Sequence, residues 1–155
     1  MTAVPSEEIR AALYRVADLR AYLTGAWRVD RALEDRRRGA HGRFEGEARF
    51  TPEGAGALAY REAGRLTLGG FATLAHRRYL SAFPAPDLAE VRFADGRPFH
   101  ELHLGDGRWT AEHLCGADLY RGTFRALGPD QWAADWEITG PRKDQVLRGR
   151  FTRAA

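Results

Sequence analysis

Residues 25–34 read Gly25-Ala26-Trp27-Arg28-Val29-Asp30-Arg31-Ala32-Leu33-Glu34, and this stretch decides the fold. Apolar and polar side chains alternate with a period close to two residues, which indicates a β-strand with one buried face. The same period continues to the C-terminus. No later stretch of 10–15 residues has a helical period, so a sheet built from βαβ units is not expected.

Turn-forming residues divide the rest of the chain into short, evenly spaced strands. Asp95-Gly96 is typical of a tight hairpin, and Ala63-Gly64 reads as a further turn. We expect strands at residues 25–34, 42–51, 57–63, 65–70, 72–83, 89–94, 98–104, 108–115, 118–127, 131–139 and 145–153. The series predicts an all-β fold, a single antiparallel β-barrel of about eight to ten strands. A barrel of that size either fills with side chains or holds one small ligand.

The N-terminal part has a different pattern. Residues 6–24 carry a helical signal, and Asp18 is placed to restart a short helix before the first strand. We expect one domain, residues 1–155. An N-terminal α-helical segment, 1–24, would plug one end of the barrel formed by 25–155.

The composition is ordinary for a soluble globular protein, with 44% hydrophobic and 29% charged residues. The net charge is only +3, and the 24 basic residues are scattered among 21 acidic ones, so no nucleic-acid partner is expected. Apolar runs fall far short of the ~20 residues of a membrane helix, so no membrane partner is expected either. A single cysteine and an N-terminus without an apolar signal core predict a cytoplasmic protein.

Trp27 opens the first predicted strand, and Arg148, Arg150 and Arg153 lie in the last one. A tryptophan at the closed end of a barrel, covered by an arginine from the final strand, resembles the lipocalin or calycin pattern. The alternative is a core tryptophan that merely packs against an arginine. Under both interpretations Trp27 is structural, and the resemblance implies a lipocalin-like barrel.

One of the motifs that hold most of the titratable and aromatic residues of the second half reads His113-x-Cys115-x-x-Asp118-x-Tyr120. The odd interval between Cys115 and Asp118 would place the two pairs on opposite strand faces, unless a bulge or turn at Gly116 reunites them. We expect a shared pocket, which His100 joins from a neighbouring strand. The alternative is a buried histidine satisfied by Asp118 or Tyr120, with Cys115 as a small core residue.

Arg77-x-Tyr79 places a guanidinium and a phenol on one strand face. In an apolar barrel this pair would fix a carboxylate or phenolate ligand through charge-assisted hydrogen bonds. The alternative is an ion pair of Arg77 with Glu62 or Asp118, since a buried arginine needs a partner.

Other residues complete the predicted ligand site. Phe99, Trp132 and Trp136 would form an apolar wall. Lys143, the only lysine, lies in the loop at residues 140–144 and would contact an anion at the barrel mouth. A Schiff-base role for Lys143 would require a lowered pKa.

A metal site is not predicted. His113 and Cys115, with His100 or Asp118, offer ligands that zinc accepts, but His-x-Cys is not a recognised zinc spacing. No phosphate loop, nucleophile elbow or HExxH motif is present, so no cofactor is expected.

The chain as a whole resembles DUF6314, a bacterial family of uncharacterised small proteins. The resemblance covers roughly residues 22–153, and no activity is transferred by it. Leu80-Ser81 departs from it, because an aromatic residue is favoured there, and this would alter the pocket wall. The motifs that carry it are Gly25-x-Trp27-x-x-x-Arg31, Gly46-x-Ala48-x-Phe50, Arg77-x-Tyr79, Asp95-Gly96-Arg97-Pro98-Phe99-His100, His113-x-Cys115-x-x-Asp118-x-Tyr120, Trp136-x-x-x-Gly140-Pro141-Arg142-Lys143-Asp144 and Arg153.

Three hypotheses for the function follow. The first is binding of a small, partly apolar and anionic organic molecule inside the barrel. The second is an enzyme of the isomerase, cyclase or hydrolase type, with His113 or His100 as general base, Asp118 orienting it, and Arg77 or Tyr120 stabilising negative charge. The third is a packed barrel that serves as a structural or interaction module. A homodimer is compatible with each.

Overall fold

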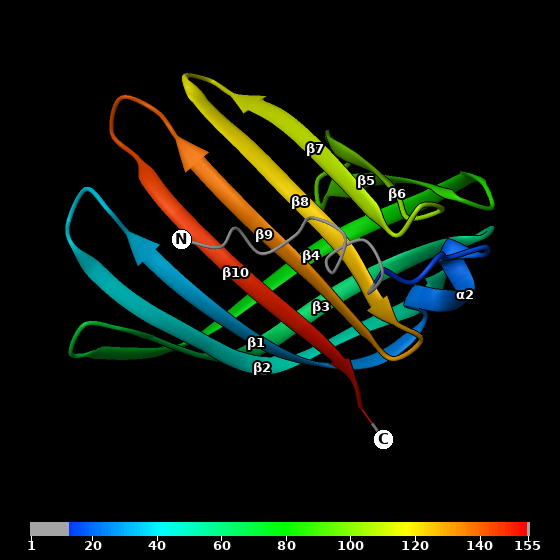
Figure 1. The fold of residues 1–155 in the computed structure, drawn as a ribbon, viewed down its shortest axis with the longest axis horizontal. Helices are drawn as coiled ribbons and strands as arrows, with labels where there is room; N and C mark the ends of the chain where they lie inside the picture. Colours follow the sequence, from blue (N-terminus) through cyan, green and yellow to red (C-terminus); the bar gives the residue numbers. More distant parts are fainter. Residues whose placement is uncertain (1–12, 155) are drawn as a thin grey trace, which may run out of the picture.

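Residues 13–154 are described by the computed structural model, and most of them lie in one antiparallel sheet (Figure 1). The strand order is β6-β5-β4-β3-β2-β1-β10-β9-β8-β7, so every hydrogen-bonded neighbour except the β1–β10 pair is also a neighbour in sequence. The elements are α2 (Leu19–Leu23), β1 (Gly25–Asp35), β2 (Ala40–Glu53), β3 (Ala57–Leu68), β4 (Phe71–Ala85), β5 (Leu88–Phe93), β6 (Pro98–His103), β7 (Arg108–Cys115), β8 (Asp118–Gly128), β9 (Gln131–Thr139) and β10 (Asp144–Arg153).

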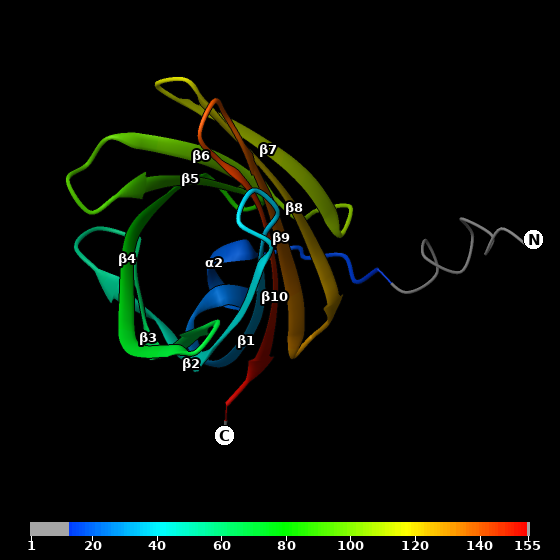
Figure 2. The same cartoon turned by 90° about the vertical axis from the view of Figure 1, so that its left-hand side faces the viewer.

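The sheet curls into a barrel that is almost closed, as Figure 2 shows in a view along its length. The two edge strands, β6 and β7, face each other without a backbone ladder in the described part of the chain. We call this junction the seam. The indole Nε1 of Trp109 bridges the seam by donating to the Glu101 carbonyl at 2.9 Å, and the rings of Trp109 and His103 pack 4.3 Å apart. The predicted single all-β barrel is therefore confirmed.

Successive strands run antiparallel, so their hairpins alternate between the two ends of the barrel. The turns after β2, β4, β6 and β8 share one end with α2, and we call this the closed end (Figure 1). The turns after β1, β3, β5, β7 and β9 lie at the other end, the open end. Within residues 13–154 no helix is long and apolar enough to cross a lipid bilayer.

Helix α2 closes its end of the barrel because its apolar residues turn inward. Leu19, Tyr22 and Leu23 are buried, and Asp18 caps the helix by accepting a hydrogen bond from the Ala21 N–H at 3.0 Å. The hydroxyl of Tyr22 lies 2.8 Å from the carbonyl oxygen of Gly128, which ties α2 to the β8–β9 turn. The restart of a helix at Asp18 is confirmed.

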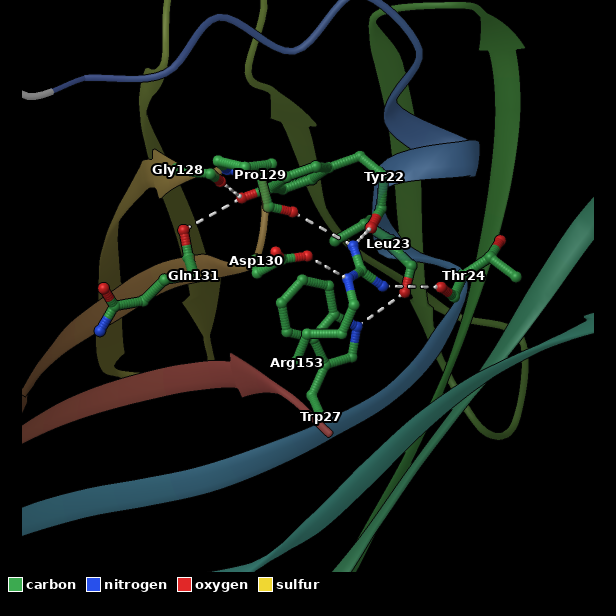
Figure 3. Close-up of polar contacts among 9 residues, drawn as sticks. All are labelled: Tyr22, Leu23, Thr24, Trp27, Gly128, Pro129, Asp130, Gln131 and Arg153. Carbon is green, nitrogen blue, oxygen red and sulfur yellow. Dashed lines mark hydrogen bonds and ion pairs between the residues drawn. The ribbon is translucent and has the colours of Figure 1, made fainter. Parts of the chain in front are cut away.

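Arg153 holds this end together, as Figure 3 shows. Its guanidinium lies 4.2 Å from the centre of the Trp27 ring and donates to the carbonyls of Tyr22 at 2.9 Å and Thr24 at 3.2 Å. Its Nε donates to Asp130 at 2.8 Å. The arginine that covers Trp27 in the predicted pattern is thus the last of the three candidates, and it joins α2, β1, β10 and the β8–β9 turn.

The structure differs from the sequence predictions at two elements, and the first is the turn predicted within β3. Ala63-Gly64 is not a turn, because β3 runs unbroken from Ala57 to Leu68. Gly64 lies opposite Gly46 on β2, and a Cβ built on Gly46 would come within 2.2 Å of the Ala63 carbonyl oxygen. Both glycines therefore allow two strands to approach closely.

The helix expected over residues 6–24 is the second difference. Its first half lies largely outside the described residues, and residues 13–17 are not helical. Instead, the N–H groups of Tyr14 and Val16 donate to the carbonyls of Ala126 at 2.9 Å and Leu104 at 3.0 Å. These tertiary hydrogen bonds replace the local ones of a helix.

Candidate functional site

The open end contains a cavity of about 630 Å³, which we call the outer cavity. Strands β4, β5 and β7 to β10 and the start of β6 supply its walls. Among the residues predicted from the sequence, those that line it are Arg77, Tyr79, Phe99, His113, Cys115, Tyr120 and Trp136.

A tight turn places the His113–Tyr120 run on one face. Gly116 and Ala117 form the two-residue β7–β8 turn, and Gly116 has a φ of +62°, as a type II′ hairpin requires at its first position. Cys115 pairs directly with Asp118, and His113 with Tyr120. Residues that are paired across an antiparallel hairpin point to the same face of the sheet. The turn at Gly116 therefore brings both pairs to one face, although the interval between Cys115 and Asp118 is odd.

Lys143 and Asp118 do not line the outer cavity, but Lys143 contacts Tyr120, which does. The Lys143 ammonium is 3.6 Å from the Asp118 carboxylate and donates to the Tyr120 hydroxyl at 3.5 Å. The hydrogen bond to Tyr120 and the nearby Asp118 charge raise the pKa of Lys143 above its ordinary value. This direction is the opposite of what a Schiff-base lysine needs.

The predicted pairing of a histidine with Asp118 is not formed. Within residues 13–154 neither His100 nor His113 hydrogen-bonds to Asp118, whose ion-pair partner is Lys143. His113 instead lies edge-on against the Phe99 ring at 5.3 Å.

A buried ion pair lies deeper in the barrel. Arg31 on β1 donates two hydrogen bonds to Glu62 on β3, at 2.7 and 2.9 Å, and the Tyr60 hydroxyl donates to the same carboxylate. Burial alone would raise the pKa of Glu62, but the hydrogen bonds and charge of Arg31 and the charge of Arg77 lower it below its ordinary value. The carboxylate is therefore ionised at neutral pH.

Arg77 is the second arginine inside the barrel and pairs across the sheet with Glu62. It is half-buried, and no carboxylate of residues 13–154 lies within 4.0 Å of its guanidinium. Glu62 is engaged by Arg31, and Asp118 by Lys143, so neither ion pair considered for Arg77 is formed. Beside it, burial raises the pKa of Tyr79, so that phenol is a neutral donor.

Aromatic rings form the apolar wall of the outer cavity. Phe93 and Phe99 stack with centroids 4.5 Å apart, and Trp136 stacks on Phe99 at 5.3 Å. Gly122 makes room for Trp136, because a Cβ at that position would lie 2.8 Å from the indole ring. Aromatic faces at this spacing suit a flat apolar group.

Sequence comparison places the chain in a family. The profile of DUF6314, a family of unknown function, matches residues 23–153, which include all ten strands. The chain belongs to DUF6314. No functionally curated protein matches this DUF6314 chain.

The DUF6314 barrel is similar to two natural proteins of known structure. One is the S-type phycobiliprotein lyase CPES from Guillardia theta, with a TM-score of 0.65 and 11% identity over 97% of this chain and 98% of that one. The other is a protein of unknown function of the DUF3598 family from Nostoc punctiforme, with a TM-score of 0.62 and 11% identity. It is matched over 92% of this chain and 51% of its own length. At such identities the similarity establishes the fold alone.

His100 and Trp132 lie away from the outer cavity. They line a second, smaller cavity of about 80 Å³, the inner chamber, which shares Arg77, Tyr79, Phe99 and Trp136 with the outer cavity. A register shift in the β5–β6 pairing leaves Phe99 without a partner, so Phe99 and His100 both contact the interior. Of the predicted residues, His100 is therefore separated from the His113–Tyr120 run.

The Arg31–Glu62–Tyr60 cluster was not predicted as a unit. Each residue lies at an inward position of its strand: Arg31 follows Val29 by two, and Glu62 follows Tyr60 by two. A charged residue in the buried register of a strand was the signal available in the sequence.

Proposed function

We propose that the outer cavity binds a small, partly apolar organic anion, with Arg77 as the anchor of its negative group. The observation that carries the proposal is the charge imbalance inside the barrel. The charged side chains that line the two cavities are Arg31, Arg77, Arg97 and Glu62. Arg31 is matched by Glu62, and Arg97 by Asp95 at 2.7 Å, which leaves the charge of Arg77.

An unmatched guanidinium in a half-buried cavity favours an anionic partner. Attraction between opposite charges is stronger there than in bulk water, because the surrounding protein has a lower dielectric constant. Arg77 presents a planar fork that suits a carboxylate or sulfonate, and the neutral Tyr79 hydroxyl supplies a further donor.

The size and walls of the cavity support an aromatic or alicyclic body for the ligand. The volume of about 630 Å³ lies inside the range of roughly 300–1,000 Å³ that is usual for small-molecule sites. Phe93, Phe99 and Trp136 offer ring faces and edges on which such a body can pack.

The test is fluorescence titration with 8-anilinonaphthalene-1-sulfonate, an aromatic anion. We expect Arg77→Met to weaken binding by roughly 10- to 100-fold, as loss of a hydrogen bond to a charged group does. Arg78→Met is the matched control, because Arg78 is exposed on the outer face of the same strand. The neutral analogue N-phenyl-1-naphthylamine should bind the wild type more weakly.

If Arg77→Met and the wild type bind the sulfonate with equal affinity and have the same thermal stability, Arg77 does not hold the anionic group and the proposal is refuted. Mass spectrometry of gently purified protein gives an independent result, because a co-purifying acid would identify the natural ligand class.

A proton-transfer enzyme is the second candidate. It is supported by the position of Tyr120, which receives a hydrogen bond from Lys143 and is the strand partner of His113. A donor and a base would then face the same ligand. His113→Ala separates the two functions: conversion of the co-purified molecule is lost and its binding kept in an enzyme, whereas in a binding protein only affinity changes.

A further inference from the structure

Besides the hydrogen-bonded Arg31, Glu62 and Tyr60, the inner chamber is lined by polar side chains that have no partner in the described part of the chain. Ser81 is only 3% exposed, and its hydroxyl makes no hydrogen bond to another of the residues 13–154. Trp132 is 4% exposed, and its Nε1–H, which is fully buried, likewise has no acceptor among those residues. Both side chains line the chamber.

His100 adds an acceptor to the same lining. Its Nδ1 is 2.7 Å from the carbonyl oxygen of Glu101, and a carbonyl can only accept, so Nδ1 carries the proton. In the neutral ring Nε2 is then an unprotonated acceptor. Burial lowers the pKa of His100 to about 4, so the ring is neutral at pH 7.

Of these groups, Trp132 Nε1 is a fully buried polar atom without a partner among residues 13–154, and such atoms are unusual in a folded protein. Nearly all buried polar atoms have a hydrogen-bond partner, because burying one without a partner is costly. A valine and a phenylalanine in place of Ser81 and Trp132 would avoid the cost. A partner supplied from outside the chain accounts for all three side chains at once.

The volume of the chamber and the hydrogen-bonding capacity of its lining limit which chemical group can be that partner. The chamber, at about 80 Å³, has room for two or three water-sized groups at ~30 Å³ each, and a ring is too large. Trp132 can only donate, neutral His100 can only accept at Nε2, and Ser81 can do both. A hydroxyl group, which both donates and accepts, matches this set, whereas a second carboxylate would meet the Nε2 lone pair of His100.

We propose that the inner chamber is a polar subsite that takes a hydroxyl group carried beside the anionic group of the bound molecule. The inference rests on the proposed function, since it assumes that the anion is held by Arg77. Arg77, Tyr79, Phe99 and Trp136 line both cavities and form the passage between them. The ligand class is thus a hydroxylated organic acid, with its apolar body in the outer cavity and its hydroxyl arm directed inward.

A series of 3-phenylpropanoates tests the subsite. The members carry hydrogen, hydroxyl, hydroxymethyl or 2-hydroxyethyl at C2, each hydroxylated member having an alkyl analogue of similar size. We expect one arm length to bind about tenfold more tightly than its alkyl analogue in calorimetric titration. The preference should shrink to about twofold or less in Ser81→Ala and in Trp132→Phe. Thr123→Ala, on a strand face directed away from the interior, is the matched control.

The outcomes separate the two proposals. If no member binds, or if binding does not depend on Arg77, the proposed function fails. If the acids bind in an Arg77-dependent manner and no hydroxyl arm is preferred, the subsite alone is refuted. A crystal structure of the complex in which only water occupies the chamber would refute it as well, and so would a preference that survives in both variants.

Discussion

Glu62 shows how one side chain sets the electrostatics of the barrel interior. Its carboxylate accepts two hydrogen bonds from Arg31 and one from Tyr60, and these keep it ionised although it is buried. A buried pair of this kind adds little net stability, but it leaves the interior without a further negative charge for Arg77. The proposed affinity for anions would therefore be a consequence of which arginine Glu62 engages.

His100 gives a prediction for pH dependence. Its pKa is about 4 in the folded protein and ~6.5 when unfolded, so between these values the unfolded chain binds the additional proton. The free energy of unfolding should therefore fall as pH decreases from ~6.5 to ~4, by at most about 3 kcal/mol. Urea denaturation at a series of pH values measures this slope. In His100→Gln the part due to His100 should disappear, and identical slopes in the two proteins would contradict the assignment.

Residue positions inside the barrel were only partly predictable from the sequence. Strand alternation correctly places Arg77 with Tyr79, and Trp132 with Trp136, on inward faces. It fails at Phe99 and His100, because a bulge turns consecutive residues toward the interior, and bulges leave no clear signal in one sequence. The partner of Asp118 was also unpredictable, since it depends on how two separate hairpins meet at the open end.

At the scale of elements, the close pairing of β2 with β3 depends on two small residues. Gly46 and Gly64 are paired, and a Cβ on either would come within 2.2 Å of a carbonyl oxygen on the opposite strand. Backbone atoms cannot move away as a flexible side chain can. The strand pair would have to separate locally and lose ladder hydrogen bonds.

Gly46→Ala should therefore destabilise the barrel by about 3 kcal/mol, the upper part of the range for overpacking. Gly70→Ala is the matched control, because a Cβ there meets no atom within 4 Å and its φ is not positive. Thermal denaturation of both variants measures the difference. Equal melting temperatures would show that the strands tolerate the added methyl group.

The elements themselves were largely predictable, because most turns carry Gly, Pro or Asp between strands of alternating pattern. The turn predicted at Ala63-Gly64 was wrong because glycine occurs both in turns and where two strands approach closely, and the sequence does not distinguish the two cases. The helix predicted over residues 13–17 was wrong for another reason. Residues 13–17 have a helical spacing of apolar groups, but tertiary hydrogen bonds of Tyr14 and Val16 determine their conformation.

At the scale of the whole molecule, we expect the barrel to be weakest along the seam. Among residues 13–154, strands β6 and β7 each have one ladder neighbour, and the Trp109–Glu101 hydrogen bond links them across the gap. Edge strands open more readily than central ones because fewer hydrogen bonds must break. The seam is therefore where the barrel should widen first.

Hydrogen exchange followed by mass spectrometry tests this expectation. Peptides from β6 and β7 should exchange faster than those from β1 and β2, which are paired on both sides. Trp109→Phe keeps an aromatic ring and removes the indole N–H, so exchange at the seam should accelerate several-fold while β1 and β2 stay unchanged. Uniform protection around the barrel in both proteins would show that the seam is not a separate opening unit.

The pairing of β1 with β10 has a consequence for biosynthesis. Every other ladder joins strands that are consecutive along the chain, so these strands can pair as hairpins while translation proceeds. The β1–β10 ladder cannot form until residues 144–153 have left the ribosome, and Arg153 completes the contact with Trp27 only then. Until that moment β1 has an unprotected edge, and an exposed strand edge is prone to associate with other chains.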